Sequence, residues 1–414
     1  MHDRALGRLV MGVVQRTLFV ISKERGELAL STIFLRDQPF AAEARVLVPE
    51  ELVSVVGPDP PAPTASYSTL EDILRAVDEQ RTDLVFLCCG YLLVHEGLLS
   101  RTELEELVAG LRSRGCRIVT SDPFLGLTPT ITNADADIQW ALTWKMGWVR
   151  ELHGWLARKL DPRGRLFELP CIEGLAHLYP TLVPDVGAQD EVDRISFFNP
   201  NTIRSRREVP ESAEEEPATW LFALSPFDYE VQKKMIGRSG ICRIVAHLIG
   251  TTQKAGRRPV LVAPPDIIEI MEALPGERDL VPFCPYGELE EQVLAAEYAF
   301  YWSTFSFSML ARVANEKPVF AFDRGRLART VRSLYAAGQA AHFGGWAPPR
   351  ISAKRLPVPK ELEFLAGKQE LAMRVVRERW QASPTPAQVV ERLLSTDPES
   401  SAVVAEDGPS EALD

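Results

Sequence analysis

The stretch AAEYAFYWSTFSFSMLARVANEKPVFAFD (Ala295–Asp323) contains two apolar runs separated by a hydroxyl-rich turn and a helical pattern. The runs YAFYWS (298–303) and PVFAFD (318–323) have the aromatic and β-branched composition of buried strands. Between them, SFSMLARVANE (306–316) has apolar residues at helical spacing. Because alternating strands and helices form parallel sheets, this stretch predicts an α/β fold.

The same alternation of short apolar strands with helical patterns runs through most of the 414 residues. In the first half, TLFVIS (17–22) and the continuous apolar run DLVFLCCG (83–90) are typical of strands in a parallel sheet that helices cover. In the second half, TWLFALS (219–225) and RPVLVAPP (258–265) repeat the pattern. Two such series predict two doubly wound, Rossmann-like α/β domains.

Composition predicts where these domains end. The segment SRREVPESAEEEPA (205–218) is polar, acidic and proline-containing, as linkers are. Residues 395–414 carry several acids and no base, which predicts a disordered tail. We therefore expect an N-terminal domain over 1–204, the acidic linker, a C-terminal domain over 219–394, and the acidic tail.

Charge and hydropathy narrow the class of protein. The net charge of −11 is concentrated in the linker and the tail, and no basic face is left for a nucleic acid backbone. No segment approaches the roughly 18 consecutive apolar residues of a membrane span. The chain lacks the glycine motif of NAD- and FAD-binding domains, and its histidines and acids show no metal-binding spacing. We expect a cytoplasmic protein that binds no nucleic acid, metal or cofactor.

Hydroxyl side chains gather where YAFYWS meets the following helix. Ser303, Thr304 and Ser306 would stand at the carboxyl end of a parallel strand, where a helix start offers free N–H groups to an anion. A plain N-cap, which needs only one such residue, is the alternative. The strand after this helix ends in Asp323 and Arg324, which suit a sugar hydroxyl and a diphosphate; a solvated charged loop is the alternative there.

The N-terminal half offers carboxylates and a histidine at the carboxyl ends of its strands. SKERGEL, the turn after the first strand, contains Gly26, which permits a tight turn, and the acids Glu24 and Glu27. His95 follows DLVFLCCG, and Asp122 follows CRIVT. Each acid or imidazole would take a proton if it faced a cleft. Each would equally serve a structural role, such as a carboxylate that stabilises a helix start.

Trp144 and Trp148 fall on one face of the helical pattern IQWALTWKMGWVRELHGWLARKL (138–160). Packing inside the protein is the usual explanation of such a stripe, and an aromatic wall that faces an apolar or ring-shaped acceptor is the alternative. His177, in CIEGLAHLYP (171–180), would line the same region.

The succession of strand, hydroxyl turn, short helix and EKPVFAFD, within a chain of two α/β domains and a central linker, resembles the GT-B superfamily of nucleotide-sugar-dependent glycosyltransferases. The resemblance implies two Rossmann-like domains that face a cleft. It implies that the hydroxyl turn, Asp323 and Arg324 bind the donor diphosphate without a metal, close to Ser225 at the end of TWLFALS.

The same resemblance implies the roles of the N-terminal half. Gly26 would lie on the acceptor side, together with Trp144, Trp148 and His177. A base among Glu27, His95 and Asp122 would take the acceptor's proton. The substrates would be a nucleotide-sugar donor and a small-molecule or glycan acceptor, with no separate cofactor.

Two other classes of protein fit the same architecture. A nucleotide-sugar epimerase would convert its substrate without any acceptor. A catalytically inactive relative would only bind a ligand or a partner protein. Release of nucleotide separates both enzymes from the inactive binder, and dependence on an acceptor separates a transferase from an epimerase.

Overall fold

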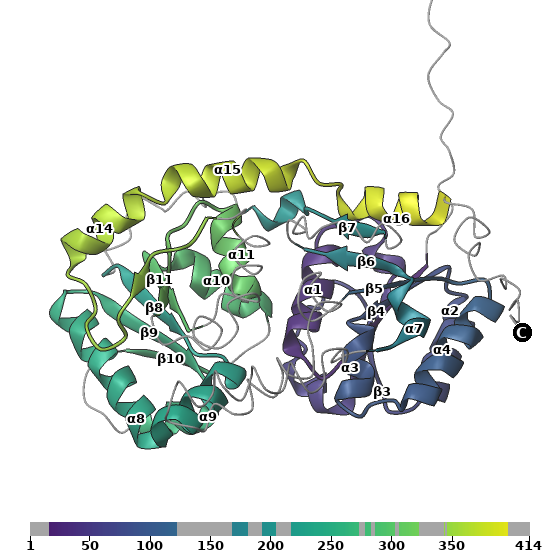
Figure 1. Ribbon diagram of the computed structural model, residues 1–414, viewed down its shortest axis with the longest axis horizontal. Coiled ribbons are helices and arrows are strands. Elements are labelled where there is room, and N and C mark those ends of the chain that lie inside the picture. The colour runs from purple at the N-terminus through teal and green to yellow at the C-terminus, as the bar shows by residue number, and fades with distance from the viewer. Residues whose placement is uncertain are drawn as a thin grey trace, which may run out of the picture.

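Two parallel β-sheets with helices on both faces make up the chain in the computed structural model (Figure 1). The structure describes residues 16–121, 168–180, 193–203, 217–272, 278–282, 286–302, 306–322, 343 and 346–395. The prediction of two doubly wound α/β units is confirmed. Among the described helices, none has the length and apolar character needed to cross a membrane.

The N-terminal sheet has seven strands in the order β3-β2-β1-β4-β5-β6-β7. They are β1 (Thr17–Ile21), β2 (Arg45–Pro49), β3 (Thr64–Tyr67), β4 (Leu84–Cys88), β5 (Arg117–Thr120), β6 (Ala176–Tyr179) and β7 (Arg194–Ser196). One face is covered by α2 (Leu70–Gln80), α3 (Gly90–His95), α4 (Arg101–Ser113) and α7 (Pro170–Glu173). The other face is covered by α1 (Arg25–Leu35). The described connections also contain the short 3-10 helices η1 (Ala41–Glu43), η2 (Glu50–Val55) and η5 (Pro200–Thr202).

The C-terminal sheet has six strands in the order β10-β9-β8-β11-β12-β13. They are β8 (Thr219–Ala223), β9 (Arg258–Ala263), β10 (Asp279–Pro282), β11 (Tyr298–Tyr301), β12 (Val319–Phe322) and β13 (Arg350–Ile351). One face packs against α8 (Pro226–Lys254), α9 (Pro265–Glu272) and α14 (Pro359–Gly367). The other face packs against α10 (Tyr286–Ala295), α11 (Phe307–Ala314) and α15 (Glu370–Gln381).

Strand β4 shows why continuous apolar runs produce this fold. All of its residues are buried. Val85 and Leu87 enter the core beneath α2 and α4, whereas Leu84 and Phe86 enter the core on the α1 side. Because side chains alternate between the two faces of a sheet, a strand covered on both faces must be apolar at every position.

The last helix, α16 (Pro386–Ser395), packs on the N-terminal sheet (Figure 1). Its Val389 and Val390 are fully buried in the core that contains α1. We expected this segment in the C-terminal domain over 219–394, but the apolar face of α16 returns the chain to the N-terminal half. Most of the predicted linker, and the predicted tail beyond Ser395, lie outside the described residues, so these two boundaries stay predictions.

Two segments differ from what their sequences predict. The composition of the proline-rich stretch 55–68 predicts a loop, but the stretch ends in the edge strand β3, which pairs with β2 directly after the last proline. The apolar pattern over 361–382 predicts a single helix, but the structure divides it into α14 and α15 around Lys368 and Gln369. The Gln369 side chain turns inward there and accepts a hydrogen bond from the backbone N–H of Val319 at 3.1 Å, which fixes the break.

Candidate functional site

Each sheet reverses its strand order at one place. The neighbours there are β1 and β4 in the N-terminal sheet, and β8 and β11 in the C-terminal sheet. In parallel α/β sheets, ligands bind beyond the carboxyl ends of the strands at such a reversal. Gly26 and Glu27 lie in the first turn of α1, which follows β1, and Ser225 and Ser306 precede the helices that follow β8 and β11, so these predicted residues lie at the expected edges.

The start of α11 is not capped by its own side chain. Ser306 occupies the N-cap position, but its hydroxyl makes no capping hydrogen bond and lies 2.8 Å from the Ser308 hydroxyl instead. The first N–H groups of a helix have no partner within the helix, so this end can donate hydrogen bonds to an anion. Ser303, Thr304, Asp323 and Arg324 lie outside the described residues, and their assignment to a donor site stays a prediction.

The start of α8 is capped by the side chain of its N-cap residue, Ser225. The Ser225 hydroxyl accepts a hydrogen bond from the Asp228 N–H at 3.1 Å and donates one to the Asp228 carboxylate at 2.7 Å. Pro226 supplies the first helical residue, which has no N–H to satisfy. Ser225 therefore stands at the expected edge, but its hydroxyl is already used as a helix cap.

Gly26 touches the start of α11 from the opposite domain. A Cβ atom at this position would lie 3.0 Å from the ring of Phe307, so close that the ring would have to shift by a few tenths of an ångström. Phe307 also packs against the α1-side core and against a small cluster of Phe198, Leu310, Ala314 and Trp380. The turn after β1 and the helix start after β11 are therefore neighbours, although they belong to different sheets.

Two glutamates in this turn have different surroundings. Glu27 is 7% exposed, and its carboxylate accepts a hydrogen bond of 3.4 Å from the Ser121 hydroxyl. Glu24 precedes α1 and is exposed to solvent, and its carboxylate makes no hydrogen bond or ion pair with the described part of the chain. The surrounding protein nevertheless removes part of its hydration and raises its pKa, against a smaller opposite effect of Arg25. Glu24 is thus the more accessible proton acceptor.

Glu96, which follows α3, makes a hydrogen bond to the turn after β1. Its carboxylate accepts a hydrogen bond from the Lys23 N–H at 2.6 Å. Desolvation raises the pKa of Glu96 to about 7, and the nearby Glu24 adds to the rise. His95, the predicted base, is the last residue of α3 and is exposed. The structure therefore brings Glu96, the neighbour of His95, into contact with the turn after β1.

His177 is a buried structural histidine. It is 4% exposed, and its Nδ1 lies 2.7 Å from the Leu175 carbonyl, which can only accept a hydrogen bond. Its Nε2 lies 3.1 Å from the Tyr91 hydroxyl. Both ring nitrogens thus have partners within the N-terminal domain, which leaves the predicted contact with an acceptor without support. Asp122, Trp144 and Trp148 lie outside the described residues.

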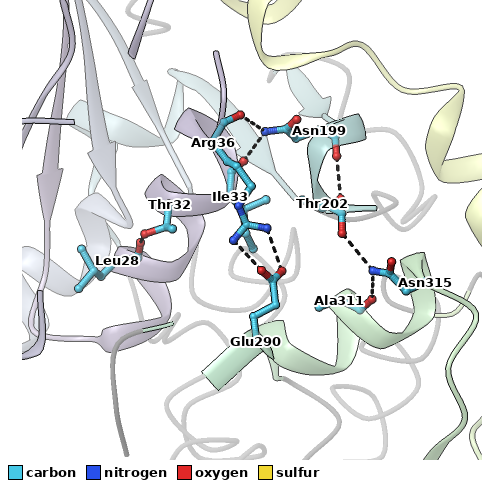
Figure 2. Close-up of polar contacts among 9 residues, drawn as sticks. All are labelled: Leu28, Thr32, Ile33, Arg36, Asn199, Thr202, Glu290, Ala311 and Asn315. Carbon is cyan, nitrogen blue, oxygen red and sulfur yellow. Dashed lines mark hydrogen bonds and ion pairs between the residues drawn. The ribbon is translucent and has the colours of Figure 1, made fainter. Parts of the chain in front are cut away.

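Polar contacts join the two domains behind this site (Figure 2). Arg36, at the end of α1, forms a two-pronged ion pair with Glu290 of α10, with N–O distances of 2.9 and 2.7 Å. The Arg36 side chain is 10% exposed and that of Glu290 is 0% exposed. Nearby, the Asn315 side chain donates a hydrogen bond to the Thr202 carbonyl at 3.0 Å. Sequence reasoning missed these contacts because nothing local distinguishes their residues.

Arg312 anchors α11 from its other end. Its guanidinium is fully buried and donates hydrogen bonds to four backbone carbonyls, those of Val293, Ala296, Glu297 and Pro318. Burial lowers the pKa of Arg312 to about 10. Two of these carbonyls end α10, where cations are favoured by the helix dipole. An arginine within the apolar run SMLARVA was the available sequence signal.

No protein-family model and no curated protein matches the chain. Solved structures do match. The spinosyn forosaminyltransferase SpnP superposes with a TM-score of 0.55 at 15% identity, over 92% of this chain and 100% of SpnP. The fold is that of the GT-B glycosyltransferases.

Two further GT-B structures agree. The glycotransferase of kitacinnamycin matches with a TM-score of 0.52 at 10% identity, over 91% of this chain and 97% of that protein. The glycosyltransferase VinC, solved in complex with dTDP, matches with a TM-score of 0.50 at 12% identity, over 92% and 98%. The resemblance to the GT-B superfamily is therefore confirmed at the level of the fold.

Proposed function

We propose that this GT-B protein is a glycosyltransferase that moves a sugar from a nucleotide-sugar donor to an acceptor between its two domains. The observation that carries the proposal is the contact of Gly26 with Phe307. It brings an accessible carboxylate, Glu24, and an uncapped helix start, that of α11, to the same place from opposite domains. A transfer between two bound substrates requires such a meeting of a base and an anion site.

On the donor side, the start of α11 binds the diphosphate. Its free N–H groups and the Ser306 hydroxyl supply hydrogen-bond donors, and Ser303 and Thr304, which precede Ser306 in the sequence, would add two more hydroxyl groups. Arg324 adds positive charge, and Asp323 binds a hydroxyl of the donor. Stabilisation of the leaving diphosphate by fixed dipoles and a cation needs no metal ion.

On the acceptor side, Glu24 takes the place that we gave to Glu27. A hydroxyl of the acceptor passes its proton to the Glu24 carboxylate while its oxygen attacks the anomeric carbon of the donor. The bond between that carbon and the diphosphate breaks, and the electron pair leaves with the nucleotide. A pKa raised toward neutrality improves Glu24 as a proton acceptor. Asp122 remains a second candidate for this role.

A panel of nucleotides and nucleotide sugars tests the proposal. A ligand that binds only the native state raises the melting temperature, so thermal shift identifies the donor class. We expect a nucleoside diphosphate and its sugar to stabilise the protein. Release of nucleotide that depends on an added acceptor then establishes transfer. Conversion of the sugar without an acceptor would indicate an epimerase instead, and no stabilisation by any nucleotide would contradict the donor site.

A further inference from the structure

Helix α1 connects the candidate reaction centre to the domain interface. Its first turn follows Glu24 and contains Gly26, and Arg36 is its C-terminal cap residue. Eleven helical residues span about 16 Å as a rigid rod. The Asn199 side chain fixes the far end of this rod by donating hydrogen bonds to the carbonyls of Ile33 and Arg36 at 2.7 and 2.9 Å (Figure 2).

The other half of the connection runs through α10 and α11. Glu290 lies on α10, and Arg312 of α11 donates hydrogen bonds to the carbonyls of Val293 and Ala296 at the end of the same helix. Any shift of Glu290 is therefore transmitted to α11, whose start carries Ser306. In Figure 2, the ion pair lies between α1 and α10, and the Asn315–Thr202 contact lies beside it.

We propose that Arg36 and Glu290 are positioning residues: their ion pair sets the spacing between the turn that carries Glu24 and the start of α11. This inference rests on the proposed function, in which these two elements hold the acceptor and the donor. An ångström-scale error in such spacing costs large factors in rate. The two-pronged geometry fixes the direction of approach as well as the distance.

Stability alone is a weak explanation of this pair. Two charges that lose their water regain little net free energy from each other, and apolar replacements of buried ion pairs are often equally or more stable. Removing one partner only, by contrast, takes the opposite charge away from a buried group and destabilises the fold. The informative variant is therefore the double replacement Arg36→Met/Glu290→Leu, which removes both charges and retains apolar contact between α1 and α10.

The double variant separates positioning from stability. We expect it to melt at or near the wild-type temperature and to bind the donor nucleotide within about twofold of wild type, or about 0.4 kcal/mol. We expect kcat for transfer to fall at least tenfold, while hydrolysis of the donor by water, which needs no aligned acceptor, is retained. The charge swap Arg36→Glu/Glu290→Arg should recover part of kcat. The same swap at the exposed pair Arg114–Asp78, which lies within the N-terminal domain, is the control.

A second measurement needs no substrate. Spin labels on non-canonical residues at Arg75 of α2 and Glu230 of α8 report the distance between the domains; both sites are well exposed. We expect a narrow distance distribution in the wild-type protein and a broader one in the Arg36→Met/Glu290→Leu variant. If no nucleotide sugar is used at all, the proposed function fails while this result stands. An unchanged distribution, or transfer at the wild-type kcat in the double variant, overturns the positioning role.

Discussion

Helices α8 and α11 begin at the same edge of the same sheet, after the adjacent strands β8 and β11, yet their first turns differ. The start of α8 is closed by Ser225 and Asp228, which use each other's hydrogen-bonding groups. The start of α11 has a serine at the same position, Ser306, that caps nothing. A serine before a helix is therefore no guide to its role until the partner of its hydroxyl is known.

The difference indicates which helix start is available to a ligand. The capping side chain of α8 satisfies one of the free N–H groups and stabilises the fold, whereas the start of α11 has no side-chain acceptor for its free N–H groups. The α11 end also faces the opposite domain through Phe307 and Gly26. The missing cap of α11 is offset by the burial of every residue from Ser308 to Ala314 and by the hydrogen bonds of Arg312.

The largest effect should come from removing the anchor of α11. Arg312→Met leaves four carbonyls without their donor; those of Val293 and Ala296 are buried, and each buried group costs about 1–3 kcal/mol. We expect the free energy of unfolding, measured by urea denaturation, to fall by about 3 kcal/mol or more. The matched change on α8, Arg238→Met, affects a half-exposed side chain and should stay within about 0.5 kcal/mol. If both variants lost the same free energy of unfolding, Arg312 would not be a special anchor of α11.

The next effect concerns Glu24, the carboxylate proposed as the base. Glu24→Gln removes the proton acceptor and keeps the shape of the side chain, so we expect kcat to fall about 100-fold or more, with nucleotide affinity unchanged. This corresponds to about 2.7 kcal/mol in activation free energy. Glu27→Gln, at the buried neighbour, should affect stability more than kcat. The reverse outcome would return the role of base to Glu27.

The two serines themselves provide a direct comparison. Ser225→Ala removes a cap and should lower the free energy of unfolding by about 1 kcal/mol, with nucleotide affinity unchanged. Ser306→Ala removes no cap and should leave stability nearly unchanged, while nucleotide affinity falls about fivefold, or about 1 kcal/mol. Calorimetric titration and thermal melts on both variants check this. If the nucleotide bound the Ser306→Ala variant as tightly as wild type, the proposed binding site at the start of α11 would be wrong.

The fold was predictable because its signals are local. β11, α11 and β12 each form from fewer than ten consecutive residues whose apolar spacing decides between strand and helix. The strands β6 and β7 were missed because they have only four and three residues and lie next to segments without periodic pattern. The position of α16 was missed because its apolar stripe shows that the helix packs, but not against which sheet.

The sequence predicted which turns contain the candidate site, but not which residue in each turn has the proposed role. The turn after β1 was identified, but the choice between Glu24 and Glu27 depends on where α1 begins, and helix ends are poorly determined by sequence. Arg36 and Glu290 lie 254 residues apart, so only the tertiary structure pairs them. The role of Ser306 depends on the direction of one hydroxyl, which no pattern of residues determines.

The smallest expected effect tests whether the turn that faces α11 responds to pH. The raised pKa of Glu96, about 7 against an ordinary 4.5, means that the folded protein binds its proton more tightly than the unfolded chain. The contribution of Glu96 to stability is therefore fully present below pH 4.5 and is lost as the pH rises toward 7. Glu96→Gln should remove this decline, so its melting temperature should fall less than that of wild type between pH 4.5 and 7. Glu103→Gln is the control. Hydrogen bonds to Ser100 lower the pKa of Glu103, so its contribution to stability is lost as the pH falls. Glu103→Gln should therefore alter the melting temperature only below pH 4.5. If the profiles of wild type and Glu96→Gln were parallel across this window, the titration of Glu96 would not contribute to the stability of the turn opposite α11.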